Sequence, residues 1–237
     1  MTFPGAIRIE VLVFEGCPHA EEAIGLASAV AEGLGPGIAV ERVEVDTPEK
    51  AAAVGFLGSP SIRVNGLDVE GRTADRGELC CRTYEGGSGV PPAWMVEAAV
   101  LRALRPRGVL FLCVANSARS QMAEAIARSI APPGTKVWSA GSRPTSVRPE
   151  AITVLQEISI DMSGHRSKAV SEIPAGQVDT VITLCGEEEC PVFLGNARRL
   201  HWGIHDPAAA TGSETDRLNA FRQVRDELRR RIEAFLQ

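Results

Sequence analysis

A cysteine and an arginine separated by five residues form the pattern with the clearest chemistry, Cys113-Val-Ala-Asn-Ser-Ala-Arg119-Ser120. The apolar run at 108–113 before it is typical of a buried strand, and 121–128 has helical spacing. The amides between them would lie at a helix N-terminus and point at one spot, which is how backbone binds anions. The helix dipole and the Arg119 guanidinium would stabilise a thiolate there. We therefore expect Cys113 to attack a tetrahedral oxyanion; the alternative is a structural cysteine at a strand end.

A second pair of thiols follows another apolar segment, residues 178–184, with Cys185 directly after it and Cys190 after Gly-Glu-Glu-Glu. A two-electron reduction needs such a pair, because its electrons leave the protein as a disulfide. Cys185 and Cys190 together with His201 and His205 also have a spacing near that of a zinc finger. Residues 197–203, however, have the pattern of a strand and a turn, whereas finger histidines lie on a helix.

One acidic residue completes the set of chemically interesting side chains in this half of the chain. Asp206 precedes Pro207, which favours an extended loop position. There it could protonate an oxygen that leaves the reacting centre, as a general acid does. The alternative is an aspartate that only forms a turn.

The composition limits the classes of protein to consider. The chain has 237 residues, 44% of them hydrophobic, with a net charge of -5, which indicates two soluble domains and argues against a nucleic-acid binder. We find no membrane segment and no export signal, so we expect a cytoplasmic protein without a membrane partner. Six cysteines in a reducing compartment are expected to be thiols rather than a disulfide scaffold.

Alternating strands and helices predict an α/β fold for the second half, with a parallel sheet covered by helices. We expect strands at 109–113, 136–139, 179–184 and 198–202 and helices at 121–130, 149–157 and 214–236. Ligands of such sheets bind beyond the carboxyl ends of the strands, where Cys113 and Cys185 both fall. The predicted domains are 1–104 and 109–237, joined by a linker at 105–108 that contains Pro106 and Gly108.

The first half has a strand at 6–14, a helix at 19–33 with Pro18 in its first turn and Cys17 at its N-cap, and a second strand at 38–45. A short helix after Pro48, a strand at 61–64, an Asn-Gly hairpin and a helix near 91–104 follow. This order resembles the thioredoxin-like superfamily, and the resemblance implies a cis Pro60 beside Cys17. The sequence Cys17-Pro-His-Ala lacks the second cysteine of the usual Cys-x-x-Cys pair.

Cys80 and Cys81 are two adjacent thiols in a loop rich in glycine. Three interpretations are open: the two cysteines are incidental, they supply the thiol that the Cys17 motif lacks, or all three cysteines form a thiolate site for a soft metal or metalloid ion.

The motifs of the second half resemble the thioredoxin-coupled arsenate reductases, which have the low-molecular-weight tyrosine phosphatase fold. Besides the Cys113 loop, the similarity rests on Ser139-Ala-Gly-Ser, on Thr183-Leu-Cys185 with Cys190, and on His201-Trp-Gly-Ile-His-Asp206-Pro207. The resemblance implies an oxyanion loop made of Val114, Ala115, Asn116, Ser117, Ala118 and Ser120, with Arg119 on the same anion.

By that resemblance Cys113 attacks arsenate and Asp206 helps a hydroxyl to leave. Cys185 then attacks Cys113 and releases arsenite, and Cys190 attacks Cys185, which leaves a Cys185–Cys190 disulfide. The implied ligands are arsenate and arsenite, with phosphate or sulfate as mimics. The resemblance implies no cofactor and no metal, but it implies a reductant, either thioredoxin or a small thiol. Some members bind potassium near Asn116, Glu124 and Ser139, and we expect the ammonium of Lys168 to replace that ion here.

Two alternative functions remain. The first is a tyrosine phosphatase, although Ala208-Ala-Ala replaces the aromatic residues that usually follow Asp-Pro in such phosphatases. The second is a non-catalytic thiol protein that binds metalloid ions through the first half.

Overall fold

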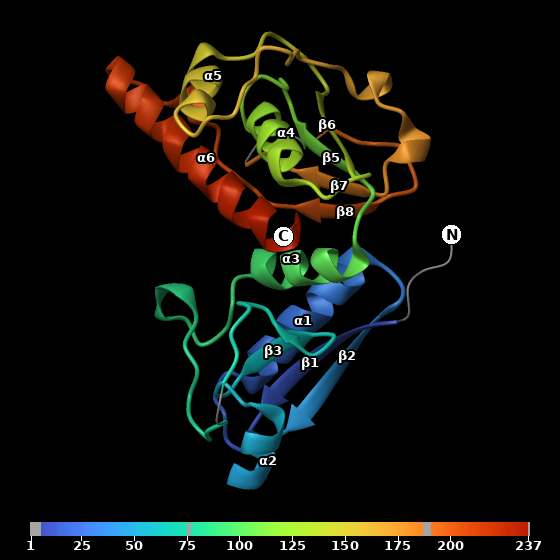
Figure 1. Ribbon diagram of the computed structural model, residues 1–237, viewed down its shortest axis with the longest axis vertical. Helices are drawn as coiled ribbons and strands as arrows, with labels where there is room; N and C mark the ends of the chain where they lie inside the picture. Colours follow the sequence, from blue (N-terminus) through green and yellow to red (C-terminus); the bar gives the residue numbers. More distant parts are fainter. Residues whose placement is uncertain (1–5, 75–76, 187–190, 237) are drawn as a thin grey trace. The chain divides into compact units, whose positions relative to one another are not determined.

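The computed structural model describes residues 6–74, 77–186 and 191–236 (Figure 1). Contacts between residues divide the chain into two compact units, residues 1–104 and 105–237, which are described separately below. None of the helices in the described ranges combines the length and the apolar composition that a membrane crossing requires.

Residues 1–104 form a mixed four-stranded sheet in the order β2-β1-β3-β4. Its strands are β1 (Ile7–Val13), β2 (Ile38–Glu44), β3 (Ser61–Val64) and β4 (Leu67–Asp68). Its helices are α1 (Ala20–Leu34), α2 (Pro48–Val54) and α3 (Ala93–Leu104), with a 3-10 turn η1 (Glu85–Gly87) before α3. The central β1 pairs parallel with β2 and antiparallel with β3, and α1 and α3 pack on each other and on β1 (Figure 1). The predicted order of elements in this half is confirmed.

The start of α1 differs from the expectation that Cys17 caps the helix. The helix begins at Ala20 with His19 at the N-cap, so Cys17 and Pro18 lie in a turn before it. In that turn the Ala20 amide donates to the Cys17 carbonyl at 3.3 Å, and the His19 ring contacts the Glu22 carboxylate at 3.1 Å. The Ser59–Pro60 peptide bond is cis.

Residues 105–237 form a parallel four-stranded sheet in the order β6-β5-β7-β8, which confirms the parallel sheet expected for this half. Its strands are β5 (Gly108–Cys113), β6 (Lys136–Gly141), β7 (Thr180–Thr183) and β8 (Arg198–His201). Its helices are α4 (Arg119–Ile130), α5 (Pro149–Gln156) and α6 (Glu214–Leu236), with 3-10 turns η2 (Val170–Glu172), η3 (Ala175–Gln177) and η4 (Pro207–Ala209).

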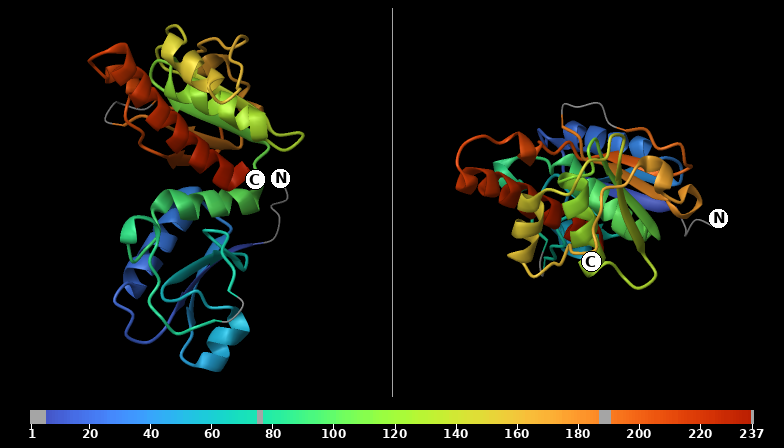
Figure 2. Two further views of the ribbon diagram at one scale, coloured as in Figure 1. Left: turned by 60° about the vertical axis from the view of Figure 1, so that its left-hand side comes forward. Right: turned by 90° about the horizontal axis from the view of Figure 1, so that it is seen from above.

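The central strand β5 is buried along its whole length, as expected for a parallel strand covered on both faces. Helix α6 packs against both α4 and α5 (Figure 2). Gly108, expected in the linker, is instead the first residue of β5. A side chain there would meet the Gln177 carbonyl at 1.8 Å, so only glycine fits this close approach.

Candidate active site

Cys113 is the last residue of the central strand β5, and its side chain is buried. The loop that follows it leads directly into α4, which begins at Arg119. The chain order strand, cysteine, loop and helix is therefore as expected, and it sets the loop at the helix N-terminus.

The loop turns its carbonyls outward. The backbone amides of Arg143, Thr145 and Arg148 donate to the carbonyls of Val114, Ala115 and Ser117 at 2.9, 3.0 and 2.9 Å. Within the described part of the chain, none of the amides of residues 114–118 donates a hydrogen bond to another protein group. Amides without internal acceptors at a helix N-terminus are what the predicted anion site requires, because a buried N–H needs a partner.

Gly141, at the end of β6, is what allows this loop to lie so close to the sheet. A Cβ there would meet the Val114 carbonyl at 2.4 Å and the Asn116 amide at 2.8 Å. Glycine is therefore the residue that fits between β6 and the anion loop, which explains its place in the Ser139-Ala-Gly motif.

The side-chain amide of Asn116 belongs to a hydrogen-bond chain that ends on the Cys113 sulfur. Its Nδ2 donates to the hydroxyl oxygens of Ser120 and Ser139, both at 2.8 Å. The Ser120 hydroxyl lies 2.9 Å from the Cys113 Sγ, and either atom can be the donor. Asn116 therefore links the side chain of Cys113, through Ser120, to Ser139.

The other end of the chain is a buried carboxylate on α4. The Ser139 hydroxyl donates to Glu124 Oε2, and the Lys168 ammonium donates to the same oxygen at 3.0 Å. Arg128 Nη2 lies 2.6 Å from the second carboxylate oxygen. The charge of Glu124, which is fully buried, is thereby balanced from two sides.

Gln121, which the sequence analysis did not single out, links the loop to the segment around Lys168. Its Nε2 donates to Asn116 Oδ1 at 2.9 Å and to the Arg166 carbonyl at 2.8 Å, and its Oε1 lies 2.9 Å from Nδ1 of His165. Burial lowers the pKa of His165 below 6.5, and the Glu124 charge opposes this effect.

Arg119 links the Cys113 loop to the backbone that follows strands β7 and β8. Its Nη1 donates to the carbonyl of Ile204 at 3.0 Å and more weakly to that of Leu184 at 3.4 Å. Its Nη2 lies 3.4 Å from Asp206 Oδ2, and Asp206 Oδ1 accepts the Ala208 amide at 3.1 Å. The structure thus brings together Arg119 and Asp206, which are far apart in the sequence.

Cys185 lies just beyond β7 and is buried. Strand β7 pairs with β5, with Leu112 opposite Thr183, and the Leu184 amide donates to the Leu112 carbonyl at 2.8 Å. Continuing that register sets Leu184 level with Cys113, so Cys185 is one residue beyond it on the adjacent strand. Cys190 lies outside the described residues.

The zinc-finger interpretation finds no support in the placement of the histidines. His201 is on strand β8, and its Nδ1 lies 2.8 Å from the Thr183 hydroxyl. Across the described ranges, no three His, Cys, Asp or Glu side chains gather into a group that could hold a metal ion.

A protein-family model described as low molecular weight phosphotyrosine protein phosphatase matches residues 108–237. The chain belongs to this family. The arsenate reductase of Halalkalibacterium halodurans is 40% identical over 129 residues, which is 54% of this chain and 93% of that protein. The arsenate reductase of Bacillus subtilis is 38% identical with the same coverage. A solved structure described as an arsenate reductase in oxidized state is 32% identical and covers 55% of this chain and 96% of its own, with a TM-score of 0.48.

The cysteines of the first unit lie outside the region that matches the phosphatase family. Cys17 is half-buried in the turn before α1, and Cys80 and Cys81 are exposed. Pro60 follows Ser59, whose hydroxyl accepts the Phe14 amide at 3.3 Å. The structure does not assemble the three thiols into a group that could hold a metal ion.

Proposed function

We propose that residues 105–237 reduce arsenate to arsenite through a relay of Cys113, Cys185 and Cys190. The supporting observation is the pairing of an anion loop around Cys113 with a second buried cysteine at the end of the adjacent strand. Relatives named arsenate reductase share 38% to 40% of the residues over this region.

The chemistry starts with arsenate held by the loop amides and Arg119. The Cys113 thiolate forms a sulfur–arsenic bond, and one arsenic–oxygen bond breaks as the oxygen leaves as water, with Asp206 supplying a proton. Cys185 then attacks the Cys113 sulfur. A disulfide forms, the sulfur–arsenic bond breaks, and its electron pair stays on arsenic, which passes from the +5 to the +3 state and leaves as arsenite.

Cys190 completes the relay by attacking the Cys185 sulfur. Cys113 leaves as a thiolate, and the two electrons given to arsenic are accounted for by a Cys185–Cys190 disulfide. An external thiol or thioredoxin must then reduce that disulfide before another turnover.

Phosphate ester hydrolysis is the second candidate, because the family model is that of a phosphatase and phosphate has the shape and charge of arsenate. A phosphatase has no use for Cys185 and Cys190 as a relay. The residues after Asp206-Pro207 are three alanines, two in the turn η4 and Ala210 directly after it, so no aromatic ring there flanks a phenyl phosphate.

The experiment is a single turnover of the fully reduced chain with arsenate and no added reductant. A reductase releases about one arsenite per chain, whereas a phosphatase releases none and hydrolyses an aryl phosphate instead. Cys113→Ser abolishes both activities, and Cys185→Ser abolishes only arsenite release.

We also propose that residues 1–104 are thioredoxin-like and supply electrons to the Cys185–Cys190 disulfide in a cytoplasmic, reducing environment. The support is the order β2-β1-β3-β4 with Cys17 in the turn between β1 and α1. Cys17→Ser is then expected to stop turnover driven by a small thiol alone and to leave the first round of arsenite release unchanged. Stoichiometric arsenite binding at Cys17, Cys80 and Cys81 without turnover would favour the metalloid-binding alternative.

Finally, we propose that Lys168 replaces a potassium ion. A cation site beside Glu124 does not fit this chain, because the Lys168 ammonium already donates to Glu124 Oε2 at 3.0 Å and to the Arg166 carbonyl at 3.2 Å. The ammonium of Lys168 then stabilises the loop around Cys113 in place of a bound ion, and no step depends on potassium.

A further inference from the structure

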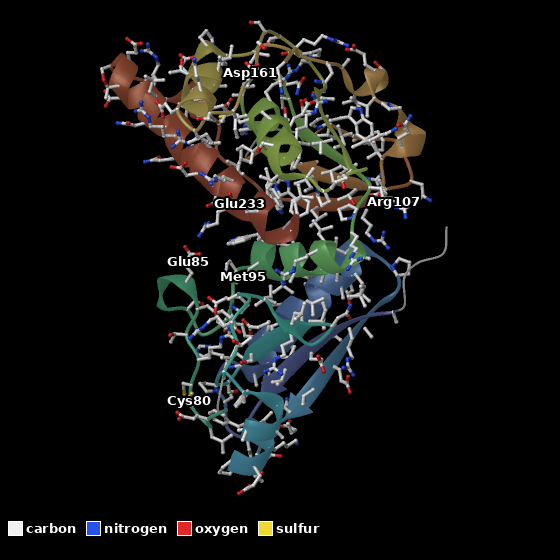
Figure 3. The ribbon with its side chains drawn as sticks, in the orientation of Figure 1. Cys80, Glu85, Met95, Arg107, Asp161 and Glu233 are labelled. Atoms are coloured by element: carbon white, nitrogen blue, oxygen red, sulfur yellow. The ribbon has the colours of Figure 1, made fainter. Side chains whose placement is uncertain are left out.

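The segment that carries Cys80 and Cys81 is fixed along Ser59 rather than free. The Ser59 amide donates to the Cys80 carbonyl at 2.8 Å, and the Arg82 amide donates to the Ser59 carbonyl at 3.0 Å. These two bonds form an isolated parallel bridge in which Cys81 is the residue opposite Ser59. Figure 3 labels Cys80 on this segment, between β4 and η1.

The bridge determines which of the two adjacent thiols lies on the same face as the Ser59 side chain. Residues paired across parallel strands have their side chains on the same face, and successive residues alternate. Cys81 therefore shares the face of the Ser59 side chain, whose hydroxyl accepts the Phe14 amide at 3.3 Å. The Cys17 amide donates to the carbonyl of that same Phe14 at 3.3 Å, so Phe14 contacts both the Ser59 side chain and the turn with Cys17.

Cys80 points the other way. A Cβ added at Gly58 would meet the Cys80 sulfur at 3.1 Å and the Cys80 carbonyl at 3.0 Å. Cys80 is therefore an internal control for Cys81, because it is also an exposed cysteine but is directed toward Gly58.

Buried contacts hold the segment in this register. Arg82, almost fully buried, donates to both oxygens of Asp68 at 2.6 and 2.9 Å and to Glu70 at 2.7 Å, and it stacks on the Tyr84 ring at 4.3 Å. The Tyr84 hydroxyl in turn donates to the Pro60 carbonyl at 3.0 Å. These anchors immediately follow Cys81, so its backbone position is set by a folded network.

The far end of the segment is also fixed close to Cys17. A Cβ at Gly89 would meet the His19 ring at 2.3 Å, so this glycine packs directly on the residue before α1. The segment between Cys81 and Gly89 therefore runs from Ser59 to the turn that holds Cys17.

We propose that Cys17 and Cys81 form a second redox site, a dithiol–disulfide pair that exchanges with disulfides. Cys17 is half-buried and Cys81 exposed, so a disulfide substrate can reach the pair. One thiolate attacks the substrate disulfide, whose bond breaks as a mixed disulfide forms. The other thiolate attacks that mixed disulfide, which closes Cys17–Cys81 and releases the substrate as two thiols, with both electrons coming from the pair.

The test equilibrates the full-length chain with mixtures of oxidised and reduced glutathione, blocks free thiols and maps disulfides by mass spectrometry. Cys80 and Cys81 fall in one tryptic peptide, residues 77–82, so the variants Cys80→Ser and Cys81→Ser separate them. We expect a link from Cys17 to this peptide in wild type and in Cys80→Ser, at the same glutathione ratio, and its loss in Cys81→Ser.

Three results would overturn the pairing: a bond that survives in Cys81→Ser, a Cys80–Cys81 disulfide in wild type, or no oxidation of Cys17 at any ratio. The experiment contains no arsenate and is repeated in Cys113→Ser. Its failure is therefore distinct from failure of the proposed reductase, which is read from arsenite release.

Discussion

Replacing Lys168 with methionine tests whether the buried charge network holds the loop of the active site. The substitution keeps most of the side-chain length and removes the ammonium that donates to Glu124 at 3.0 Å, where the side chain of Glu124 is 1% exposed and that of Lys168 15%. Breaking a buried ion pair by removing one partner costs about 3–5 kcal/mol. Arg128 and the Ser139 hydroxyl still contact the carboxylate, so we expect a loss at or just below the lower end of this range, about 2–3 kcal/mol.

The matched control is Lys136→Met, because Lys136 is exposed and, among the described residues, its ammonium contacts only Gln177, at 2.7 Å. Surface substitutions of this kind change stability by about 0.5 kcal/mol or less. Urea unfolding is followed by the fluorescence of Trp138 and Trp202 in a Trp94→Phe background, since Trp94 belongs to the other unit.

The same variants test whether the Lys168 ammonium replaces a potassium ion. Wild type should be as stable and as active in potassium chloride as in sodium chloride at equal ionic strength, whereas Lys168→Met should regain part of its stability only in potassium. Equal losses in Lys168→Met and Lys136→Met, or a steep response of wild type to potassium, would refute the reasoning.

Three further predictions follow from the contacts described above. Arg82→Met should destabilise the first unit by about 3–5 kcal/mol, because it leaves the buried Asp68 unpaired. The control Arg72→Met should cost less than about 1 kcal/mol, because the Arg72 side chain is 57% exposed and lies 3.7 Å from Glu70. Urea unfolding followed by Trp94 fluorescence measures both losses. Burial lowers the pKa of His165 from 6.5, so the unfolded chain binds this proton more readily; its contribution to stability is complete above pH 6.5 and is lost as the pH falls below that value. His165→Asn should therefore flatten the decline in unfolding free energy below pH 6.5, and an unchanged slope would exclude His165 as its source. Cys190→Ser should release one arsenite and stop at a Cys113–Cys185 disulfide, whereas Cys185→Ser should release none, which arsenite assay and disulfide mapping distinguish.

The sequence predicted the parts of this site that rest on local patterns. An apolar run, a cysteine and an amphipathic segment predicted β5, α4 and the loop between them. The helix begins at Arg119, two residues earlier than expected, because the expectation counted only the apolar face of the helix.

The sequence patterns did not predict the long-range polar contacts. Gln121 contacts Asn116, His165 and the Arg166 carbonyl, and no periodicity encodes partners so far along the chain. The bridge between Ser59 and Cys81 is equally unpredictable, because a single pair of residues has no alternation to detect. The expected capping role of Cys17 was wrong, because Pro18 and His19 form a turn before the helix.

The central claim is tested most directly by mixing the fully reduced chain with arsenate, without other reductant, and counting arsenite while disulfides are mapped. The relay predicts about one arsenite per chain from Cys113 chemistry and a new Cys185–Cys190 disulfide. Absence of both arsenite and a new disulfide, with the thiols shown to be reduced at the start, would contradict it.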